Sequence, residues 1–160
     1  MSEKNRPALE VYSHCGSDEG LLEWLRERAE AGLDRILAHP GTEEAILPAL
    51  ESVEVTLVSD EAIAEVHGEF LDDPTPTDVI TFHHGEILIS EETARREGPA
   101  HGKSAAEETL LYLVHGLLHL NGHVDASEPE RSEMHRAQEE ILFQILRSGA
   151  IRVRNIDQTS

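Results

Sequence analysis

Residues 104–125 read SAAEETLLYLVHGLLHLNGHVD, and this stretch places the strongest constraint on the fold. Its leucine and valine side chains fall on almost every side of a helix, which predicts a buried helix rather than a surface one. Ser104 and Glu107 have the spacing of a capping box, and Gly122 is a typical helix stop. Other elements must surround such a helix, so we expect it to lie at the centre of the molecule.

The remaining sequence predicts one domain around that helix. Apolar alternation or β-rich composition predicts four strands, at residues 8–13, 52–59, 78–82 and 86–90. Further helices are expected after Asp18 and Asp60 as N-caps, from about Glu91, and from about Glu128 to Gly149. The expected fold class is α+β, with a roughly four-stranded mixed sheet packed with four to five helices. This single domain spans residues 1–160, with a core from about 8 to 148 and a frayed tail at 150–160.

Length and composition narrow the class of protein. A chain of 160 residues with 39% hydrophobic residues fits one globular domain with its own core. No run approaches the ~20 apolar residues of a membrane span, and the N-terminal MSEKNRPALEVYSHCG lacks the apolar core of a signal peptide. Cys15 is the only cysteine, which excludes an intrachain disulfide and a cysteine-based metal site. We therefore expect a cytoplasmic protein without a membrane partner.

The chain is strongly acidic. It carries 32 acidic against 13 basic residues, a formal net charge of −19. This charge disfavours loose binding to a polyanion, because each phosphate contact usually needs a cation. A local basic or metal-centred patch on an acidic body remains compatible with it.

His115 and His119 are the first candidates for chemistry. Residues four apart on a helix project from the same face, so both imidazoles can reach one metal ion. A buried polar ring without a partner costs about 1–3 kcal/mol, so two rings on a leucine-rich helix favour a shared purpose. The alternative is that both are ordinary core or surface histidines, because this spacing also arises by chance.

A third metal ligand is available just past the helix stop. His123 and Asp125 follow Gly122, where the chain turns back toward the pair. Two histidines and a carboxylate leave one position open for water, as in catalytic zinc sites. In the zinc metallopeptidase motif H-E-x-x-H, a glutamate after the first histidine acts as general base. Gly116 occupies that place here, so a peptidase of this kind would lack its base.

Two segments of the chain resemble the YbeY-type family of bacterial rRNA maturation factors, which are metal-dependent endoribonucleases. HGLLHLNGHVD (115–125) is similar to the family motif H-G-x-L-H-x-x-G-[YH]-D-H. DPTPTDVITF (73–82) resembles D-x-P-T-D-V-[LI]-[ST]-F, and the GEILIS that follows resembles a glycine-acid strand. The resemblance covers about residues 54–146, with the segments in the family's order.

The resemblance implies a site, a cofactor and a substrate. It implies one zinc ion per chain, held by His115, His119 and Asp125, with His123 as the alternative third ligand and a metal-bound water as the catalytic group. The implied activity is a single-strand-type endoribonuclease in 16S rRNA 3′-end maturation and ribosome quality control. Ribosomal RNA and small-subunit ribosomal proteins are the implied partners.

The sequence departs from the family at two places. The third motif histidine is replaced by Asp125, whose added negative charge makes a bound metal a weaker Lewis acid. The family arginine, thought to act on the phosphate, is replaced by Leu71, which cannot stabilise charge. That stabilisation would then come from the metal, from backbone donors, or from Lys103, Arg95 or Arg96.

These departures keep other functions open. The absent arginine and the acidic charge favour a metal-stabilised ribosome assembly factor that does not cleave RNA. A zinc metallopeptidase is the third alternative. Thr77 and Asp78 lie where a loop enters a strand, and Asp78 is expected to fix this loop by hydrogen bonds. A direct functional role is the alternative. His83 and His84 either line the cleft or fill a hairpin turn, and His135 is expected to be solvated.

Overall fold

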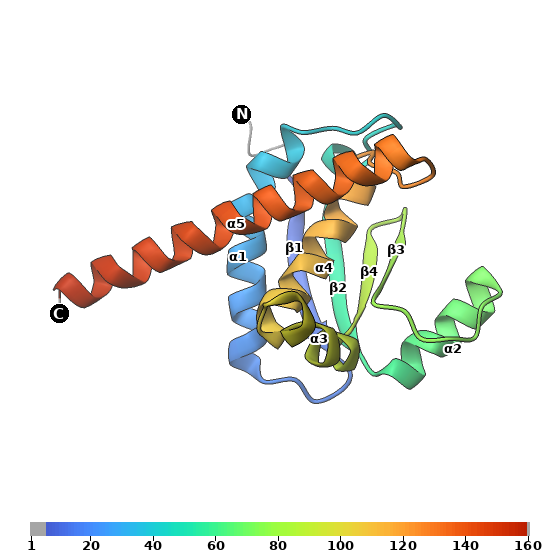
Figure 1. Ribbon diagram of the computed structural model, residues 1–160, viewed down its shortest axis with the longest axis horizontal. Coiled ribbons are helices and arrows are strands. Elements are labelled where there is room, and N and C mark those ends of the chain that lie inside the picture. Colours follow the sequence, from blue (N-terminus) through green and yellow to red (C-terminus); the bar gives the residue numbers. More distant parts are fainter. Residues whose placement is uncertain (1–5, 160) are drawn as a thin grey trace.

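The computed structural model describes the backbone of residues 6–159 and the side chains of residues 6–147. Its strands are β1 (Ala8–Ser13), β2 (Ser52–Val58), β3 (Val79–Phe82) and β4 (Glu86–Ser90). Its helices are α1 (Glu19–Leu37), α2 (Asp60–Leu71), α3 (Glu91–Glu97), α4 (Ala105–Leu120) and α5 (Glu128–Thr159), with short 3-10 turns at Leu47–Ala49 and Pro99–His101 (Figure 1). The expected α+β fold is confirmed.

The four strands form one mixed sheet in the order β1-β2-β4-β3. β1 runs parallel to β2 and β2 parallel to β4, whereas β3 is antiparallel to β4. The β3–β4 hairpin closes through a bond from the Gly85 amide to the Phe82 carbonyl at 2.9 Å, with Gly85 at φ +108°. A left-handed conformation of this kind favours glycine, so HHG is the predicted hairpin turn.

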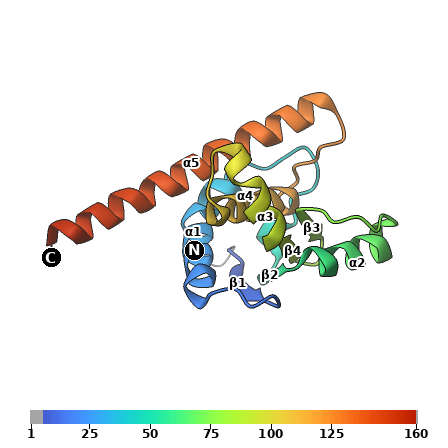
Figure 2. The same ribbon diagram turned by 60° about the horizontal axis from the view of Figure 1, so that its bottom comes forward.

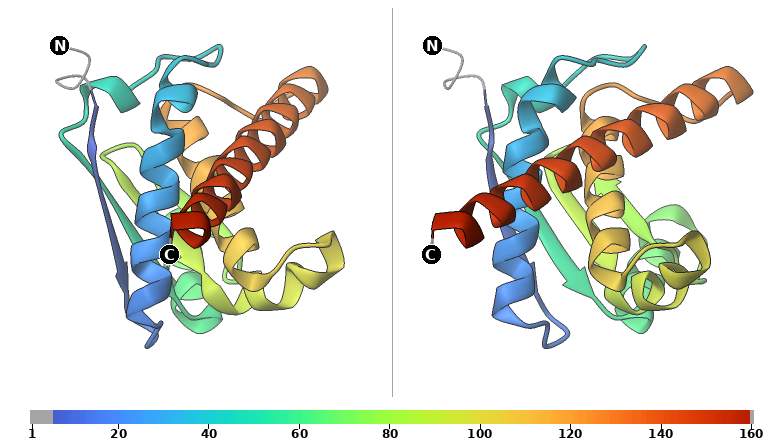
Figure 3. Two further views of the ribbon diagram at one scale, coloured as in Figure 1. Left: turned by 90° about the vertical axis from the view of Figure 1, so that its left-hand side faces the viewer. Right: turned by 60° about the vertical axis from the view of Figure 1, so that its left-hand side comes forward.

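Helices cover both faces of the sheet. In β4, Ile87 and Ile89 belong to the main core under α1 and α4, whereas Leu88 belongs to a smaller core with Ile63 of α2. This alternation follows the two-residue repeat of a strand. α5 lies across α1 and α4 and adds an outer layer, as Figure 3 shows in two views. Figure 2 places α2 at the end of the molecule opposite the C-terminal end of α5.

α4 is the buried central helix that its sequence predicts. Eleven of its 16 residues are buried. At its start, the Glu107 amide donates to Ser104 Oγ at 3.1 Å and the Ser104 amide donates to Glu107 Oε1 at 2.9 Å. Gly122 follows its last turn with φ +96°. The capping box and the glycine stop are both confirmed.

Two expected helix boundaries are wrong. Ser59, not Asp60, caps α2, because its extended backbone lets its hydroxyl accept from the Ala62 amide at 3.1 Å. α5 does not end at Gly149 but continues as helix to Thr159. A single glycine weakens a helix by only about 1 kcal/mol, too little to stop one.

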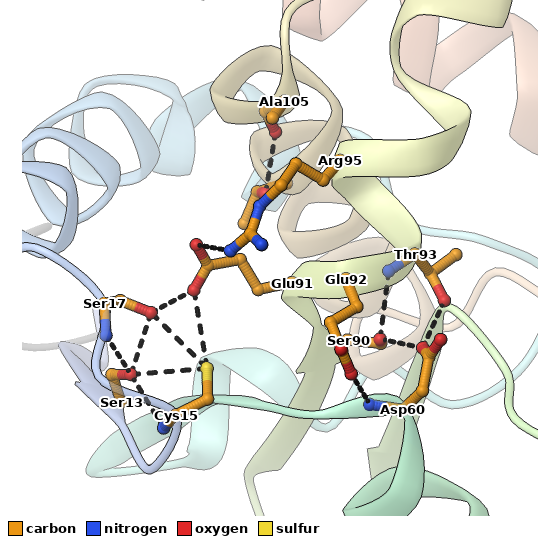
Figure 4. A network of polar contacts seen from close by, with 11 residues as sticks. Ser13, Cys15, Ser17, Asp60, Ser90, Glu91, Glu92, Thr93, Arg95 and Ala105 are labelled. Carbon is orange, nitrogen blue, oxygen red and sulfur yellow. Dashed lines mark hydrogen bonds and ion pairs between the residues drawn. The ribbon is translucent and has the colours of Figure 1, made fainter.

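Asp60 instead joins the start of α2 to the start of α3. Its carboxylate accepts from the hydroxyls of Ser90 and Thr93, as Figure 4 shows. It also accepts from Arg96, whose Nη1 lies 3.0 Å from Oδ2 of Asp60. Burial acts to raise the pKa of Asp60, but these hydrogen bonds together lower it below its usual value. Ser90 also caps α3 by accepting from the Thr93 amide at 3.1 Å. The network therefore orients α3, which leads into the α4 cap.

Candidate functional site

The histidine pair lies on the face of α4 that meets the β3–β4 hairpin. The rings of His115 and His119 are half-buried, with centroids 4.7 Å apart and planes at 81°. Between them, a Cβ on Gly116 would lie 2.8 Å from Cδ1 of Ile87 and 3.1 Å from the Thr81 hydroxyl. The helix backbone therefore touches the sheet, and this position has no room for the glutamate of a zinc metallopeptidase.

Hydrogen bonds set the orientation of both rings. Nδ1 of His115 lies 2.7 Å from Oε1 of Gln138 on α5, and Nδ1 of His119 lies 3.0 Å from the His123 carbonyl. An oxygen acceptor requires Nδ1 to carry the proton, which leaves the Nε2 lone pair of each ring available. Histidine ligands of metals are held in this way. Gln138 was not foreseen, because no sequence spacing relates it to His115.

Burial keeps His119 in the form that binds metals. Burial lowers the pKa of His119 below its usual value, and the neighbouring His115 lowers it further. The neutral ring is therefore favoured near pH 7, and only a neutral imidazole has a lone pair for a metal. The buried site thus favours the ligand form before any ion arrives.

The chain leaving α4 is held against the loop that follows α1. The Gly41 amide donates to the Asn121 carbonyl at 3.0 Å, and the Glu43 amide donates to the Gly122 carbonyl at 2.9 Å. The Asn121 side chain also donates to the Ile36 carbonyl at 2.7 Å. A Cβ on Gly122 would lie 2.5 Å from the Glu43 carbonyl oxygen. The segment after the helix therefore has a defined path.

His123 and Asp125 take different positions on that path. His123 is 5% exposed, and its Nε2 lies 2.7 Å from the His39 carbonyl, so its ring belongs to the packing of the loop. Asp125 is exposed and lines a cavity of ≈ 370 Å³ together with His115 and His119. In the part of the chain with described side chains, no three His, Cys, Asp or Glu groups are already gathered closely enough to hold a metal ion. Asp125 therefore lines the same cavity as His115 and His119, but its carboxylate is not close enough to the two rings for the three to hold a metal ion.

A second cavity of ≈ 830 Å³ adjoins the first. The two share four lining residues: Thr77, Asp78, Val79 and His115. Together they form a cleft between α4 and the segment that enters β3. His115 stands where the two hollows meet, so a substrate in the larger one would reach the histidine pair.

Three basic side chains that line the larger cavity, Lys103, Arg96 and His101, each have a carboxylate partner. Nζ of Lys103 lies 3.5 Å from Oε1 of Glu139, and Nδ1 of His101 lies 2.9 Å from Oε2 of Glu108. Arg96, also in the lining, pairs with Asp60. A phosphate entering the cavity would compete with these carboxylates.

Glu108 was not foreseen as a buried residue. Its side chain is only 1% exposed, and Oε1 has no hydrogen-bond partner. Burial raises the pKa of Tyr112 far above its usual value, and the nearby carboxylate of Glu108 raises it further. His135, expected to be solvated, is exposed but also lines this cavity.

The loop before β3 is held by Asp73 rather than by Asp78. Oδ1 of Asp73 accepts from the Thr75 amide at 3.1 Å and from its hydroxyl at 2.6 Å. The Asp78 side chain has only a 3.5 Å contact with the Thr77 hydroxyl, and it lines both cavities. The expectation that hydrogen bonds from Asp78 fix the loop is therefore wrong. Asp78 instead presents a carboxylate to the cleft.

Aromatic and aliphatic side chains form the outer rim of the smaller cavity. Leu71, Phe82 and His83 line it, and Leu71 is 56% exposed. His84 stacks on Phe82 at 5.6 Å between ring centroids. Arg95, one of the candidates to replace the family arginine, does not line either cavity. It pairs with Glu91 at 2.8 Å, in the network of Figure 4 that also includes Ser13, Cys15 and Ser17. The residue at the place of the family arginine is thus an exposed apolar side chain at the cavity.

Comparisons with known proteins agree with these motifs. A family model described as Endoribonuclease YbeY matches residues 21–146. A protein named Endoribonuclease YbeY from Clavibacter sepedonicus is 31% identical over 156 residues, covering 87% of this chain and 90% of that protein. Another from Rhodopirellula baltica is 41% identical over 97 residues, covering 54% and 50%.

A solved structure has a similar fold. The solution structure of TM1509 from Thermotoga maritima superposes with a TM-score of 0.62 at 24% identity. The superposed region covers 91% of this chain and 93% of the Thermotoga maritima chain, so the likeness extends over nearly the whole domain.

Among the described residues, no helix is both long and apolar enough to cross a membrane.

Proposed function

The chain belongs to the YbeY family of endoribonucleases, and we propose that its reaction uses one zinc ion held by His115, His119 and Asp125. Family membership makes it a nuclease, a hydrolase of phosphodiester bonds. The observation that carries the zinc proposal is that His115, His119 and the exposed carboxylate of Asp125 line one cavity. Two imidazoles and a carboxylate are a common donor set for catalytic zinc.

The protein's own residues prepare this donor set. Gln138 and the His123 carbonyl hold the two rings, and burial keeps His119 neutral. When bound, zinc supplies a Lewis acid and activates water for attack on a phosphodiester. Asp125 is the preferred third ligand, because Nε2 of His123 is engaged with the His39 carbonyl and His123 lines a different cavity.

The biological substrate follows from the family resemblance. We propose a single-strand-type endoribonuclease that acts in the cytoplasm on the 3′ end of 16S rRNA and in ribosome quality control. Small-subunit ribosomal proteins are the proposed partners. The cleft supports a strand-shaped substrate, because its two hollows meet at His115.

Zinc content of purified protein tests the metal proposal. We expect about one zinc per chain in the wild type and in His123→Gln, and loss of zinc in Asp125→Asn. Glutamine can still donate to the His39 carbonyl, and circular dichroism checks that each variant is folded. Zinc retained by Asp125→Asn but lost from a folded His123→Gln would move the third ligand to His123. Wild-type protein that binds no zinc would overturn the site.

A non-cleaving assembly factor is the second candidate. It is favoured by Leu71 at the cavity rim and by the carboxylate partners of Lys103 and Arg96. The zinc-loaded protein should cleave single-stranded RNA, and a chelator should stop that cleavage. Zinc-loaded, folded protein that binds small subunits but cleaves no single-stranded RNA would establish the second candidate instead.

A further inference from the structure

Three aromatic rings from separate elements gather at the rim of the candidate zinc site. Phe70 lies in the last turn of α2, Phe82 ends β3, and His84 lies in the hairpin turn. The Phe70 and Phe82 centroids are 5.6 Å apart at 78°, and those of Phe82 and His84 are 5.6 Å apart at 17°. Phe82 is partly buried against the core under α2, so it anchors the two outer rings.

The outer rings of this cluster are open to solvent. Phe70 is 62% exposed, and the His84 side chain is 71% exposed. The chain has only three phenylalanines, and two of them lie in this cluster. Exposing a large ring contributes little to folding, because an apolar side chain stabilises a protein by leaving water. Both outer rings are therefore accessible to a ligand.

The cluster is continuous with the candidate zinc site. Phe82 lines the cavity that contains His115, His119 and Asp125. Phe70 packs edge-on against Phe82 and directly precedes Leu71, another lining residue. A strand whose phosphate lies at the histidine pair would carry its neighbouring bases past these rings.

The electrostatics of the cleft favour stacking over phosphate contacts. The net charge is −19, and Lys103 and Arg96 are paired with carboxylates. Bases that are not paired in a duplex expose their faces, and proteins bind them by stacking on Phe, Tyr, Trp or His. An acidic nuclease with few available cations would gain most from this mode.

We propose that Phe70, Phe82 and His84 form a stacking ledge that binds a base of single-stranded RNA beside the scissile phosphate. This inference rests on the proposed ribonuclease function and specifies how its substrate is held. Duplex RNA does not fit the ledge, because its bases are already stacked. With at most two phosphate contacts, log affinity should change with log salt by a slope of about −1.4 or less steeply.

Binding of a fluorescent single-stranded oligoadenosine tests the ledge, with 2′-O-methyl groups to slow cleavage. Phe70→Ala should weaken binding by about 5- to 150-fold, and Phe70→Trp should retain it. Phe143→Ala is the matched control, because Phe143 is also 62% exposed but lies on α5. His84→Ala should weaken binding less, since Phe70 remains.

Parallel measurements separate this inference from the proposed function. Zinc content and cleavage of unmodified single-stranded RNA are measured on the same preparations. If the wild type binds and cleaves RNA but Phe70→Ala binds as tightly as Phe143→Ala, the ledge is wrong and the nuclease stands. If Phe70→Ala loses only binding to ribosomal proteins, the rings serve a protein partner and the ledge is also wrong. A wild type that neither binds nor cleaves RNA overturns both.

Discussion

The two walls of the smaller cavity are held in different ways. The inner wall is α4, which carries His115 and His119 and whose Gly116 lies against Ile87. Directly after α4, Gly122 packs against the Glu43 carbonyl and holds the end of this wall in place. The outer wall includes Asp125 and the 56% exposed Leu71, both open to solvent. The inner wall is continuous with the core, so a change there alters the fold and the chemistry together. On the outer wall the chemistry can change while the fold is retained.

The largest effect is expected from Gly122→Ala, at the glycine that follows the inner wall. Alanine at φ +96° is strained, and its Cβ would lie 2.5 Å from a backbone oxygen. We expect the free energy of unfolding to fall by about 3 kcal/mol, from strain and overpacking together. Urea denaturation measures this loss. Gly102→Ala is the control, because φ is +71° but nothing lies within 4 Å, so only the strain should remain.

Gln138→Leu removes a ring partner without touching a ligand. His115 would lose the 2.7 Å contact that holds its Nδ1. Zinc affinity should fall by about 10- to 100-fold, the usual effect of losing such a partner. Competition with a chromogenic chelator measures it, and Gln144→Leu on the same helix is the control. Equal affinity in the two variants would show that α4 alone orients the ring.

Ser104→Ala tests the N-terminal cap of α4, the helix that forms the inner wall. It removes the hydroxyl that accepts from the Glu107 amide at 3.1 Å. Loss of an N-cap lowers the free energy of unfolding by about 1 kcal/mol. Thermal or urea unfolding should register this loss with zinc affinity unchanged, because the cap lies far along α4 from the histidines. A large loss of zinc would mean that the whole helix shifts.

The smallest effect on stability is expected from Leu71→Arg on the outer wall. Substitution at an exposed position changes the free energy of unfolding by no more than about 0.5 kcal/mol. The new guanidinium would face the cavity of the histidine pair and could bind a phosphate bidentately. RNA cleavage by the zinc-loaded protein should therefore rise. Unchanged cleavage would indicate that charge at this place does not limit the reaction.

Local patterns were sufficient to predict much of the fold. The buried helix, its capping box and the HHG hairpin depend on neighbouring residues, so the sequence expresses them directly. Ser59 and Asp60 were both suitable caps, and only the three-dimensional network shows that Asp60 serves α3 instead.

The arrangement of the candidate site could be predicted only where its residues are close in sequence. His115, His119 and Asp125 share one short stretch, and the structure places all three in one cavity. Gln138 and the His39 carbonyl come from distant elements, so no motif reveals them. The burial of Glu108 was missed for the same reason, because it depends on what packs over α4.

The closeness of the proposed ligands along the chain has a consequence for protein synthesis. All three lie within residues 115–125, before any of α5. A nascent chain displays the whole donor set before Gln138 has been added. Zinc that also binds the unfolded chain stabilises the fold only by the difference between the two affinities. With the proposed ligand set, zinc could bind before the chain has folded, and the later docking of α5 would bring Gln138 to the ring of His115 and fix its orientation.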